Sequence, residues 1–238
     1  MEVIIVDAGN TRIKVAAFYQ SEIVELMFFN LSKKDDFKTF IEKYGATPIF
    51  VSSVLADEEL KAFMGNSTYS VLRSDLKMEI ENLYESPKTL GLDRLANAVA
   101  IQHMNPMGCK VSIDLGTCIK FDFVNEKGQY LGGSISPGLR MRYESLNHFT
   151  GKLPLLETKG EANLIGANSQ DSIHSGVING MKGEIIQLMN RYSQDYQGLT
   201  FFVTGGDMKY FEFDSKNNIF AHENLTLYGL YYIYQQNA

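Results

Sequence analysis

In VIIVDAGNTRIKVAAF, residues 3–18, a short polar turn separates two apolar runs. The runs at 3–6 and 13–18 are rich in β-branched residues, which favours two strands. Gly9 lets the chain turn tightly, so that successive backbone N–H groups can point at one anion. The alternative is an ordinary hairpin turn capped by Asp7. Taken alone, the stretch favours the hairpin and leaves phosphate binding open.

The same pattern returns in KVSIDLGTCIKFDFV, residues 110–124. Asp114 matches Asp7, Gly116 matches Gly9, and Thr-x-Ile-Lys follows in both copies after a one-residue gap. The alternative is that two unrelated turns converged on Asp-x-Gly, because Asp and Gly are common turn residues. Since Ile-Lys recurs beyond the turn, we favour duplication. A spacing of about a hundred residues is too long for a solenoid and predicts two related lobes.

The elements around these turns predict an α/β fold, because a meander of strands is followed by alternating helices and strands in each half. The expected strands are 3–6, 13–18, 23–29, 48–54, 69–72, 110–114, 119–124, 130–136 and 199–204, and the expected helices include 33–44, 57–64, 169–192 and 225–236. Pro106 and Gly108 break the helix that precedes the second half. We therefore expect an N-terminal lobe at 1–108 and a C-terminal lobe at 109–238.

Composition and net charge limit the classes of molecule that the chain is expected to bind. The chain has 238 residues, 45% of them hydrophobic, which suffices for one large core or two modest ones. The net charge of −6 argues against nucleic-acid binding, which depends on neutralising phosphates with Lys and Arg. No apolar run approaches the roughly 20 residues that span a bilayer. With two cysteines and Glu2 where a secretory signal would be basic, we expect a cytoplasmic protein without nucleic-acid or membrane partners.

A second candidate site lies in YESPKTLGLDRLANAVA, residues 84–100. Pro87 and Gly91 frame a loop, and a helix begins at Asp93. Asp93 could be a helix cap with Arg94 as a solvated neighbour. However, Arg is a poor choice at the positive end of a helix dipole unless an anion binds there. The pair could then divide two tasks, with the carboxylate accepting a proton from a hydroxyl and the guanidinium holding a carboxylate.

Other glycine-rich stretches are more ambiguous. Gly205-Gly206-Asp207 follows an expected strand, which suits either close approach to a phosphate or adenosine, or an ordinary helix start. The stretch GGSISPG at 132–138 is expected to end a strand and start the next helix. It suits a wall that a ligand touches, or merely a glycine-rich strand end, and we assign no chemistry to it. The glycines at 176, 180 and 183 lie near one helix face and indicate close packing against a neighbour. The four histidines have no metal-ligand spacing, and P-loop, dinucleotide and Gly-x-Ser-x-Gly motifs are absent.

Taken together, DAGNTRIK, YESPKTLGLDR, IDLGT, GGSISPG and TGGD resemble the type III pantothenate kinases of the actin/hexokinase/Hsp70 superfamily. The resemblance spans nearly the whole chain, and the stretch from Tyr84 to Arg94 is its most specific part. It implies two lobes of the actin-like ATPase (ribonuclease H-like) type, each a mixed sheet with flanking helices, with the active site between them. It also implies a dimer that phosphorylates pantothenate with ATP and Mg²⁺, the first step of coenzyme A biosynthesis.

The resemblance assigns roles to individual residues. Asp93 would be the general base, and Asp7 would lie near Mg²⁺. Asp114 would hold a monovalent cation such as K⁺ or NH₄⁺. The residues that would bind ATP are Asp7, Ala8, Gly9, Asn10, Thr11, Arg12, Ile13, Lys14 and Thr117. The residues that would bind pantothenate are Tyr84, Gly91, Leu92, Asp93, Arg94 and Ser169.

This chain departs from the family pattern at two positions. Many members continue after the second turn with small residues and threonines, whereas this chain has Cys118-Ile119-Lys120. An ammonium group at Lys120 would replace or weaken the monovalent cation site if it points inward, and would leave that site unchanged if it points outward. Ser169 stands where threonine is usual and keeps the hydroxyl.

Two other functions stay open at this stage. An accessory or regulatory protein could keep the fold without the activity, because fold does not fix function. Loss of an acidic residue at either turn or at position 93 would have favoured that interpretation, and none is lost. Another small-molecule kinase of the superfamily is the second alternative, although a sugar kinase would not need a carboxylate-binding arginine at position 94.

Overall fold

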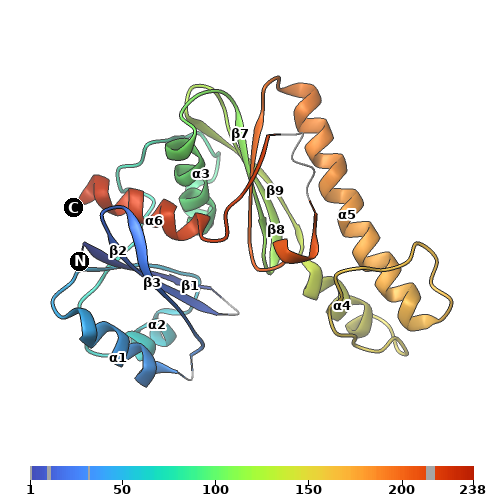
Figure 1. Cartoon of the computed structure of the whole chain (residues 1–238), viewed down its shortest axis with the longest axis horizontal. Helices are drawn as coiled ribbons and strands as arrows, with labels where there is room; N and C mark the ends of the chain where they lie inside the picture. Colours follow the sequence, from blue (N-terminus) through green and yellow to red (C-terminus); the bar gives the residue numbers. More distant parts are fainter. Residues whose placement is uncertain (1, 10–11, 32, 213–217) are drawn as a thin grey trace. The chain divides into compact units, whose positions relative to one another are not determined.

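The chain folds as two units, each containing strands of a mixed β-sheet (Figure 1). The computed structural model describes residues 2–9, 12–31, 33–212 and 218–238. Unit 1 comprises Met1–Met104 with Asn224–Ala238, and unit 2 comprises Asn105–Glu223. The expected α/β class is therefore confirmed.

The final helix lies in a different unit from the one expected. We expected residues 109–238 to form a single lobe, but α6 (Leu225–Asn237) packs in unit 1 against α3 (Leu92–Met104). A Cβ on Gly229 would lie only 1.8 Å from the carbonyl oxygen of Ala96, so this glycine lets the two helix backbones approach. Thr226 Oγ1 also donates a hydrogen bond of 2.8 Å to Asn97 Oδ1.

Unit 1 contains a sheet in the order β3-β2-β1-β4-β5. Its strands are β1 (Val3–Ala8), β2 (Ile13–Tyr19), β3 (Glu22–Phe29), β4 (Ile49–Ser53) and β5 (Ser70–Val71). Its remaining elements are α1 (Lys34–Tyr44), α2 (Asp57–Met64), the short strand β6 (Glu81–Asn82) and the 3₁₀ turn η1 (Pro87–Thr89). The early strands and both of these α-helices match the sequence predictions to within a few residues.

The central strand of unit 1 is buried on both faces because apolar residues run along it without alternation. Ile4 and Val6 pack with Phe37 of α1 and Phe63 of α2 in one apolar cluster. On the opposite face α6 contacts β1, and the ring of Tyr231 stacks on Phe18 at 4.4 Å. Figure 1 shows α1 and α2 on one side of β1–β3 and α6 on the other.

Unit 2 repeats this strand arrangement. Its strands are β7 (Lys110–Leu115), β8 (Cys118–Val124), β9 (Gln129–Pro137), β10 (Thr200–Thr204) and β11 (Ile219–Ala221). Its helices are α4 (Leu139–His148), α5 (Ser169–Asp195) and the 3₁₀ turn η2 (Met208–Tyr210). The orders β3-β2-β1-β4 and β9-β8-β7-β10 correspond strand for strand, with one parallel neighbour in each.

The register extends the correspondence to single residues. Asp7 lies opposite Lys14 across the β1–β2 hairpin, and Asp114 lies opposite Lys120 across the β7–β8 hairpin. This correspondence agrees with the duplication predicted from the sequence. No helix in the described ranges has both the length and the apolar character needed to cross a membrane.

A buried pair joins α4 and α5 through Tyr143 and His174. His174 Nδ1 lies 2.8 Å from the Tyr143 hydroxyl, and both residues are buried. Burial is the main cause that lowers the pKa of His174, and it also raises the pKa of Tyr143. The folded protein therefore holds the imidazole neutral at pH values where an exposed imidazole would be protonated.

We expect the unfolding free energy to fall as the pH drops below about 6.5, the ordinary histidine value. In that range the unfolded chain binds a proton that the folded His174 does not, and the effect ends below the lowered folded pKa. His174→Gln should remove this part of the pH dependence of the melting temperature. The exposed His148 provides the control His148→Gln, which should keep it. Equal pH dependence in the parent and in His174→Gln would contradict the assignment.

Candidate active site

The first turn joins β1 to β2 and carries most of the predicted ATP-binding residues. Asp7 is half-buried near the end of β1. The Gly9 N–H donates a hydrogen bond of 3.2 Å to the Arg12 carbonyl. The Arg12 guanidinium lies over the ring of Phe28, 5.2 Å from its centre. Asn10 and Thr11 lie outside the described residues. The hairpin interpretation of the sequence is thus correct for the backbone, and a hairpin of this kind can also present donors to an anion.

The second turn joins β7 to β8 and closes in a similar way, with one residue fewer than the first. The Gly116 N–H donates to the Cys118 carbonyl at 3.2 Å, and Thr117 is exposed at the tip. Next to the turn, Lys120 Nζ lies 2.7 Å from Asp114 Oδ2. Lys120 therefore points toward Asp114, which decides between the two orientations that the sequence left open.

Two further glycine motifs of unit 2 meet this second turn. A Cβ on Gly138 would lie 2.3 Å from the Gly116 carbonyl oxygen, and the Gly138 N–H donates to the Thr117 carbonyl at 3.1 Å. Gly205 has φ of 100°, and a Cβ there would lie 2.4 Å from the backbone of Leu115. Backbone from three separate segments therefore converges at the end of β7, where the glycines leave little side-chain bulk near the turn.

Sequence reasoning missed the part that Gly138 takes in this arrangement. The stretch GGSISPG was expected to end a strand and start a helix, and this is confirmed, because β9 ends at Pro137 and α4 begins after Gly138. The packing of Gly138 against the second turn was not expected. A signal was present, because Pro137 followed by glycine ends β9 abruptly. Its contact with Gly116, however, depends on tertiary packing that local sequence does not encode.

The acceptor side of the predicted site lies at the start of α3. Asp93 Oδ1 accepts a hydrogen bond of 2.9 Å from the Arg94 N–H, and a Cβ on Gly91 would lie 2.6 Å from the same oxygen. Gly91 therefore leaves space for the carboxylate. Asp93 is half-buried in the first turn of the helix, where the helix dipole favours a negative charge.

Arg94 and Tyr84 lie together, as expected for two residues of one binding site. The Arg94 guanidinium carbon lies 5.6 Å from the centre of the Tyr84 ring, and Arg94 is only 4% exposed. The sequence interpretation in which Arg94 is a solvated first-turn residue is therefore wrong. A buried guanidinium stacked on an aromatic ring can hold a carboxylate with planar, two-point geometry.

Ser169 lies in unit 2, whereas Asp93 and Arg94 lie in unit 1. It is the first residue of α5, and its side chain is exposed. The helix begins there because the Asn168 side chain accepts a hydrogen bond of 2.9 Å from the Asp171 N–H.

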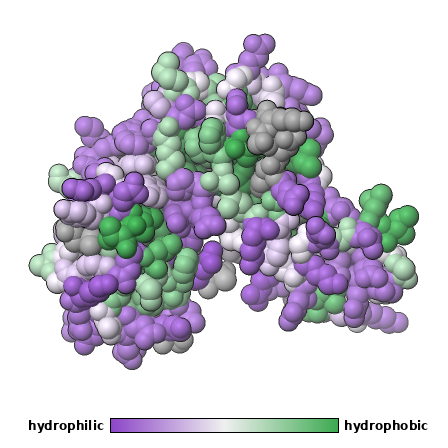
Figure 2. Space-filling model, viewed as in Figure 1, coloured by the Kyte–Doolittle hydropathy of each residue, from purple (hydrophilic) through white to green (hydrophobic). Residues whose placement is uncertain are grey.

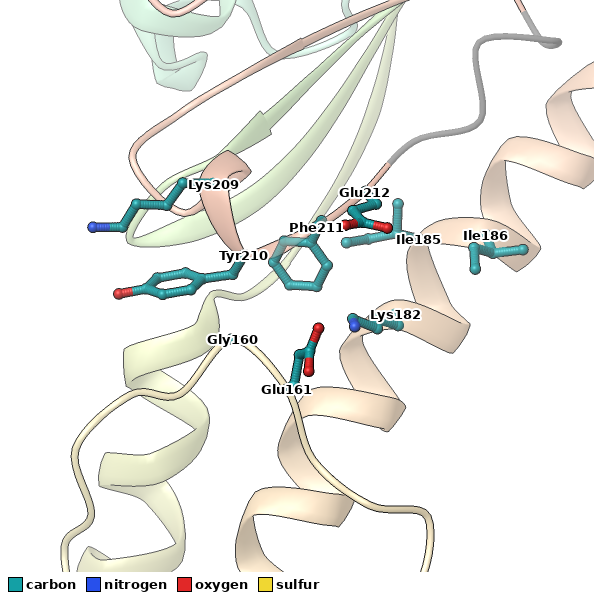
Figure 3. A pocket seen from close by; sticks show the side chains of 9 residues that line it. All are labelled: Gly160, Glu161, Lys182, Ile185, Ile186, Lys209, Tyr210, Phe211 and Glu212. Atoms are coloured by element: carbon teal, nitrogen blue, oxygen red, sulfur yellow. The ribbon is translucent and has the colours of Figure 1, made fainter.

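A cavity of about 430 Å³ lies in unit 2 beyond the Gly205 turn (Figure 3). Tyr210 and Phe211 line it from the segment that follows Gly205-Gly206-Asp207, and Lys182 lines it from α5 (Figure 3). Its lining mixes apolar, aromatic and charged side chains: Gly160, Glu161, Lys182, Ile185, Ile186, Lys209, Tyr210, Phe211 and Glu212. The sequence did not single out this cavity, because its walls come from three distant segments.

The donor set at the first turn fits Mg²⁺ arriving with a nucleotide. Mg²⁺ is usually held by one or two carboxylates together with substrate phosphates and water. Asp7 supplies one carboxylate at the end of β1. Over the described part of the chain, no three or more His, Cys, Asp or Glu side chains are grouped so that they could hold a metal by themselves.

Comparison with known proteins finds one family that matches most of the chain. The model of a family described as type III pantothenate kinase matches residues 3–191. A type III pantothenate kinase of Flavobacterium johnsoniae is 36% identical, over 98% of this chain and 97% of the relative. One from Christiangramia forsetii is 38% identical, over 98% of each chain.

Solved structures share the fold at much lower identity. A Campylobacter jejuni protein, provisionally named a Baf family transcriptional activator, aligns with a TM-score of 0.61 at 20% identity, over 98% of both chains. A Listeria monocytogenes protein, provisionally named an N-acetylmannosamine kinase, aligns with a TM-score of 0.56 at 14% identity, over 100% of both. These two likenesses establish the two-lobed fold and nothing about the substrate.

Proposed function

The chain belongs to the family of type III pantothenate kinases, and we propose that it phosphorylates pantothenate with Asp93 as the general base. The reaction transfers the γ-phosphoryl group of ATP to the primary hydroxyl of pantothenate, the first step of coenzyme A biosynthesis. One observation carries the residue assignment: Asp93, Gly91, Arg94 and Tyr84 form one connected group at the start of α3.

The geometry of that group supports two separate tasks. One oxygen of Asp93 is fixed by the Arg94 N–H. Held in this way, the carboxylate can orient the substrate hydroxyl and take up its proton as the phosphoryl group transfers. The buried guanidinium of Arg94, against the Tyr84 ring, suits the carboxylate at the other end of pantothenate. Gly91 and Leu92 would complete the wall of the substrate site.

We assign the two glycine turns to the phosphates of ATP. Phosphoryl transfer needs alignment and charge neutralisation more than covalent help from the protein. The first turn would supply backbone donors and Lys14, with Asp7 holding Mg²⁺, which neutralises charge on the phosphates. The second turn would contribute Thr117. The cavity beside η2 suits the nucleoside part of ATP, because its aromatic residues directly follow Gly205-Gly206-Asp207.

The cavity assignment predicts a selective change in nucleotide affinity. Tyr210→Ala removes an aromatic wall of the cavity. Base–aromatic stacking contributes about 1–3 kcal/mol, so the KM for ATP should rise roughly 5- to 100-fold. The KM for pantothenate should change little. Tyr69→Ala, at a half-buried tyrosine of unit 1, is the control for general destabilisation. An unchanged ATP KM in Tyr210→Ala would place the nucleoside elsewhere.

We further propose that the enzyme is a homodimer that pairs through α5. The glycines at 176, 180 and 183 are exposed, and a Cβ on any of them would meet no heavy atom within 4 Å in the described chain. Exposed glycines within a helix cost about 1 kcal/mol each relative to alanine, which close helix packing would offset. Figure 2 shows apolar side chains at the end of unit 2 that carries the segment before α5, where Leu164 and Ile165 are over 80% exposed.

The remaining expectations follow from the reaction. ATP and pantothenate are the small-molecule partners, and we keep the sequence expectation of a cytoplasmic enzyme without nucleic-acid or membrane partners. An accessory protein without kinase activity has no specific observation in its favour, because Asp7, Asp93, Arg94 and Asp114 are all present. The family resemblance also implies a monovalent cation at Asp114, and we do not include it in the proposed mechanism because that carboxylate contacts Lys120.

The test is ADP release by the purified chain with ATP and Mg²⁺, in the presence of pantothenate, pantothenol or no acceptor. We expect pantothenate-dependent release. Pantothenol lacks the carboxylate, so its KM should be roughly 10- to 100-fold higher, as expected for a lost charged hydrogen bond. ADP release that does not depend on pantothenate would overturn the proposed kinase function. Equal KM values for the two acceptors would overturn the role of Arg94.

A further inference from the structure

The ion pair between Lys120 and Asp114 lies at the second turn, and the proposed mechanism assigns it no role. The two side chains are 15% and 14% exposed, and Nζ lies 2.7 Å from Oδ2. The two residues face each other across the β7–β8 hairpin. Asp114 lies two positions before Gly116, and Lys120 lies three positions after Thr117. The pair is thus held by strand register, in a place where water screens it only in part.

The donor set at Asp114 does not fit an additional monovalent cation. A K⁺ ion replaces its hydration shell with several oxygen ligands. One oxygen of Asp114 already contacts an ammonium group. A second cation on the same carboxylate would lie within a few ångströms of Nζ, and like charges at that range repel strongly in a partly buried site. The carboxylate also carries only one negative charge, which Lys120 balances.

We infer that Lys120 supplies the positive charge at the second turn that a monovalent cation would otherwise supply, so that the enzyme works without K⁺ or NH₄⁺. The inference rests on the proposed function and deepens it. A lysine side chain ends in a compact, strongly hydrated ammonium with three donors, which is chemically close to a bound NH₄⁺. Because it is covalently attached, it is present at every cation concentration. Its neighbour Thr117 is exposed at the turn, where a phosphate can approach.

The packing around the turn keeps this charge in place. Gly138 and Gly205 approach the backbone of Leu115, Gly116 and Thr117 so closely that a Cβ on either glycine would overlap it. The Asp207 N–H also donates to the Leu115 carbonyl at 2.9 Å. The turn therefore has little freedom to open a wider site in which Asp114 could leave Lys120 and take an ion instead.

The experiment compares the wild-type enzyme with Lys120→Ala and Lys120→Met in buffers that contain K⁺, NH₄⁺ or only the bulky cation N-methylglucamine, at equal ionic strength. For the wild type we expect initial rates of pantothenate phosphorylation that agree within about 2-fold in all three buffers, because equal ionic strength gives equal screening. Both variants should lose about 10-fold or more without K⁺ or NH₄⁺, and a saturable part should return when either ion is added. Lys127→Ala, at an exposed lysine in the β8–β9 turn, should behave as the wild type.

A second readout does not depend on activity. We expect K⁺ to raise the melting temperature of the two Lys120 variants relative to N-methylglucamine, because an ion that binds only the folded state stabilises it. The wild type should show no such shift. Stimulation of the wild type by K⁺, a K⁺-dependent melting shift in the wild type, or cation-independent activity in both variants would each overturn the inference. Absence of phosphopantothenate in every buffer would instead refute the proposed function, and the melting shift would still decide the cation question.

Discussion

Asp93→Asn should abolish most of the turnover and leave ATP binding nearly intact. The substitution keeps the size of the side chain, and its amide oxygen can still accept the hydrogen bond from the Arg94 N–H. The amide cannot take up the proton of the substrate hydroxyl. General base catalysis contributes about 10²- to 10⁴-fold, and we expect a loss of kcat in that range. The measurement is initial-rate ADP release with saturating pantothenate, combined with calorimetric titration of ATP.

The matched control is Asp57→Asn. Asp57 is an exposed carboxylate in the first turn of α2, in the same unit as Asp93, and it tests the effect of removing a helix-terminal charge. We expect kcat to stay within about 2-fold of the wild type. An Asp93→Asn enzyme with normal kcat would show that the carboxylate only caps the helix, as the alternative interpretation of the sequence held.

Gly205→Ala should disrupt unit 2 at the second turn. Position 205 has φ of 100°, where a side chain is strained, and its Cβ would lie 2.4 Å from the Leu115 backbone. A strained backbone and an overpacked contact each cost about 1–3 kcal/mol, so the total should be roughly 3 kcal/mol or more. For a chain of this size, that corresponds to a fall in melting temperature of about 6–12 °C. Differential scanning calorimetry measures it.

The control for this glycine is Gly151→Ala, because a Cβ at position 151 meets no heavy atom within 4 Å. Its melting temperature should stay within about 2 °C of the wild type. If Gly205→Ala melts at the wild-type temperature, the close approach of the Gly205 turn to Leu115 does not exist in solution. The convergence of three segments on the second turn would then lose its support.

The strand pattern and both glycine turns could be predicted because their signals are local. Apolar β-branched runs on either side of Gly9 and Gly116 specify hairpins, and the repeated Ile-Lys after each turn indicated two related lobes. The structure places Asp7 opposite Lys14 and Asp114 opposite Lys120 in the same way. The start of α3 was likewise readable, since Asp93 follows a loop framed by Pro87 and Gly91.

Features that depend on contacts between distant segments could not be predicted. Helix α6 follows unit 2 in the chain but packs on Ala96 of unit 1, and only the tertiary contact explains why Gly229 is needed. Arg94 is buried by tertiary packing, with its guanidinium over the Tyr84 ring, and sequence patterns cannot tell a buried first-turn arginine from a solvated one. The direction of Lys120 was also undecided until the ion pair with Asp114 was seen.

The most direct test of the central claim is phosphorus NMR of the products formed from ATP and pantothenate by the purified enzyme. We predict a new phosphomonoester signal that couples to methylene protons, as expected for 4′-phosphopantothenate, and that grows in step with the ADP signals. Release of ADP with inorganic phosphate and no such ester signal would contradict the claim that this chain is a pantothenate kinase.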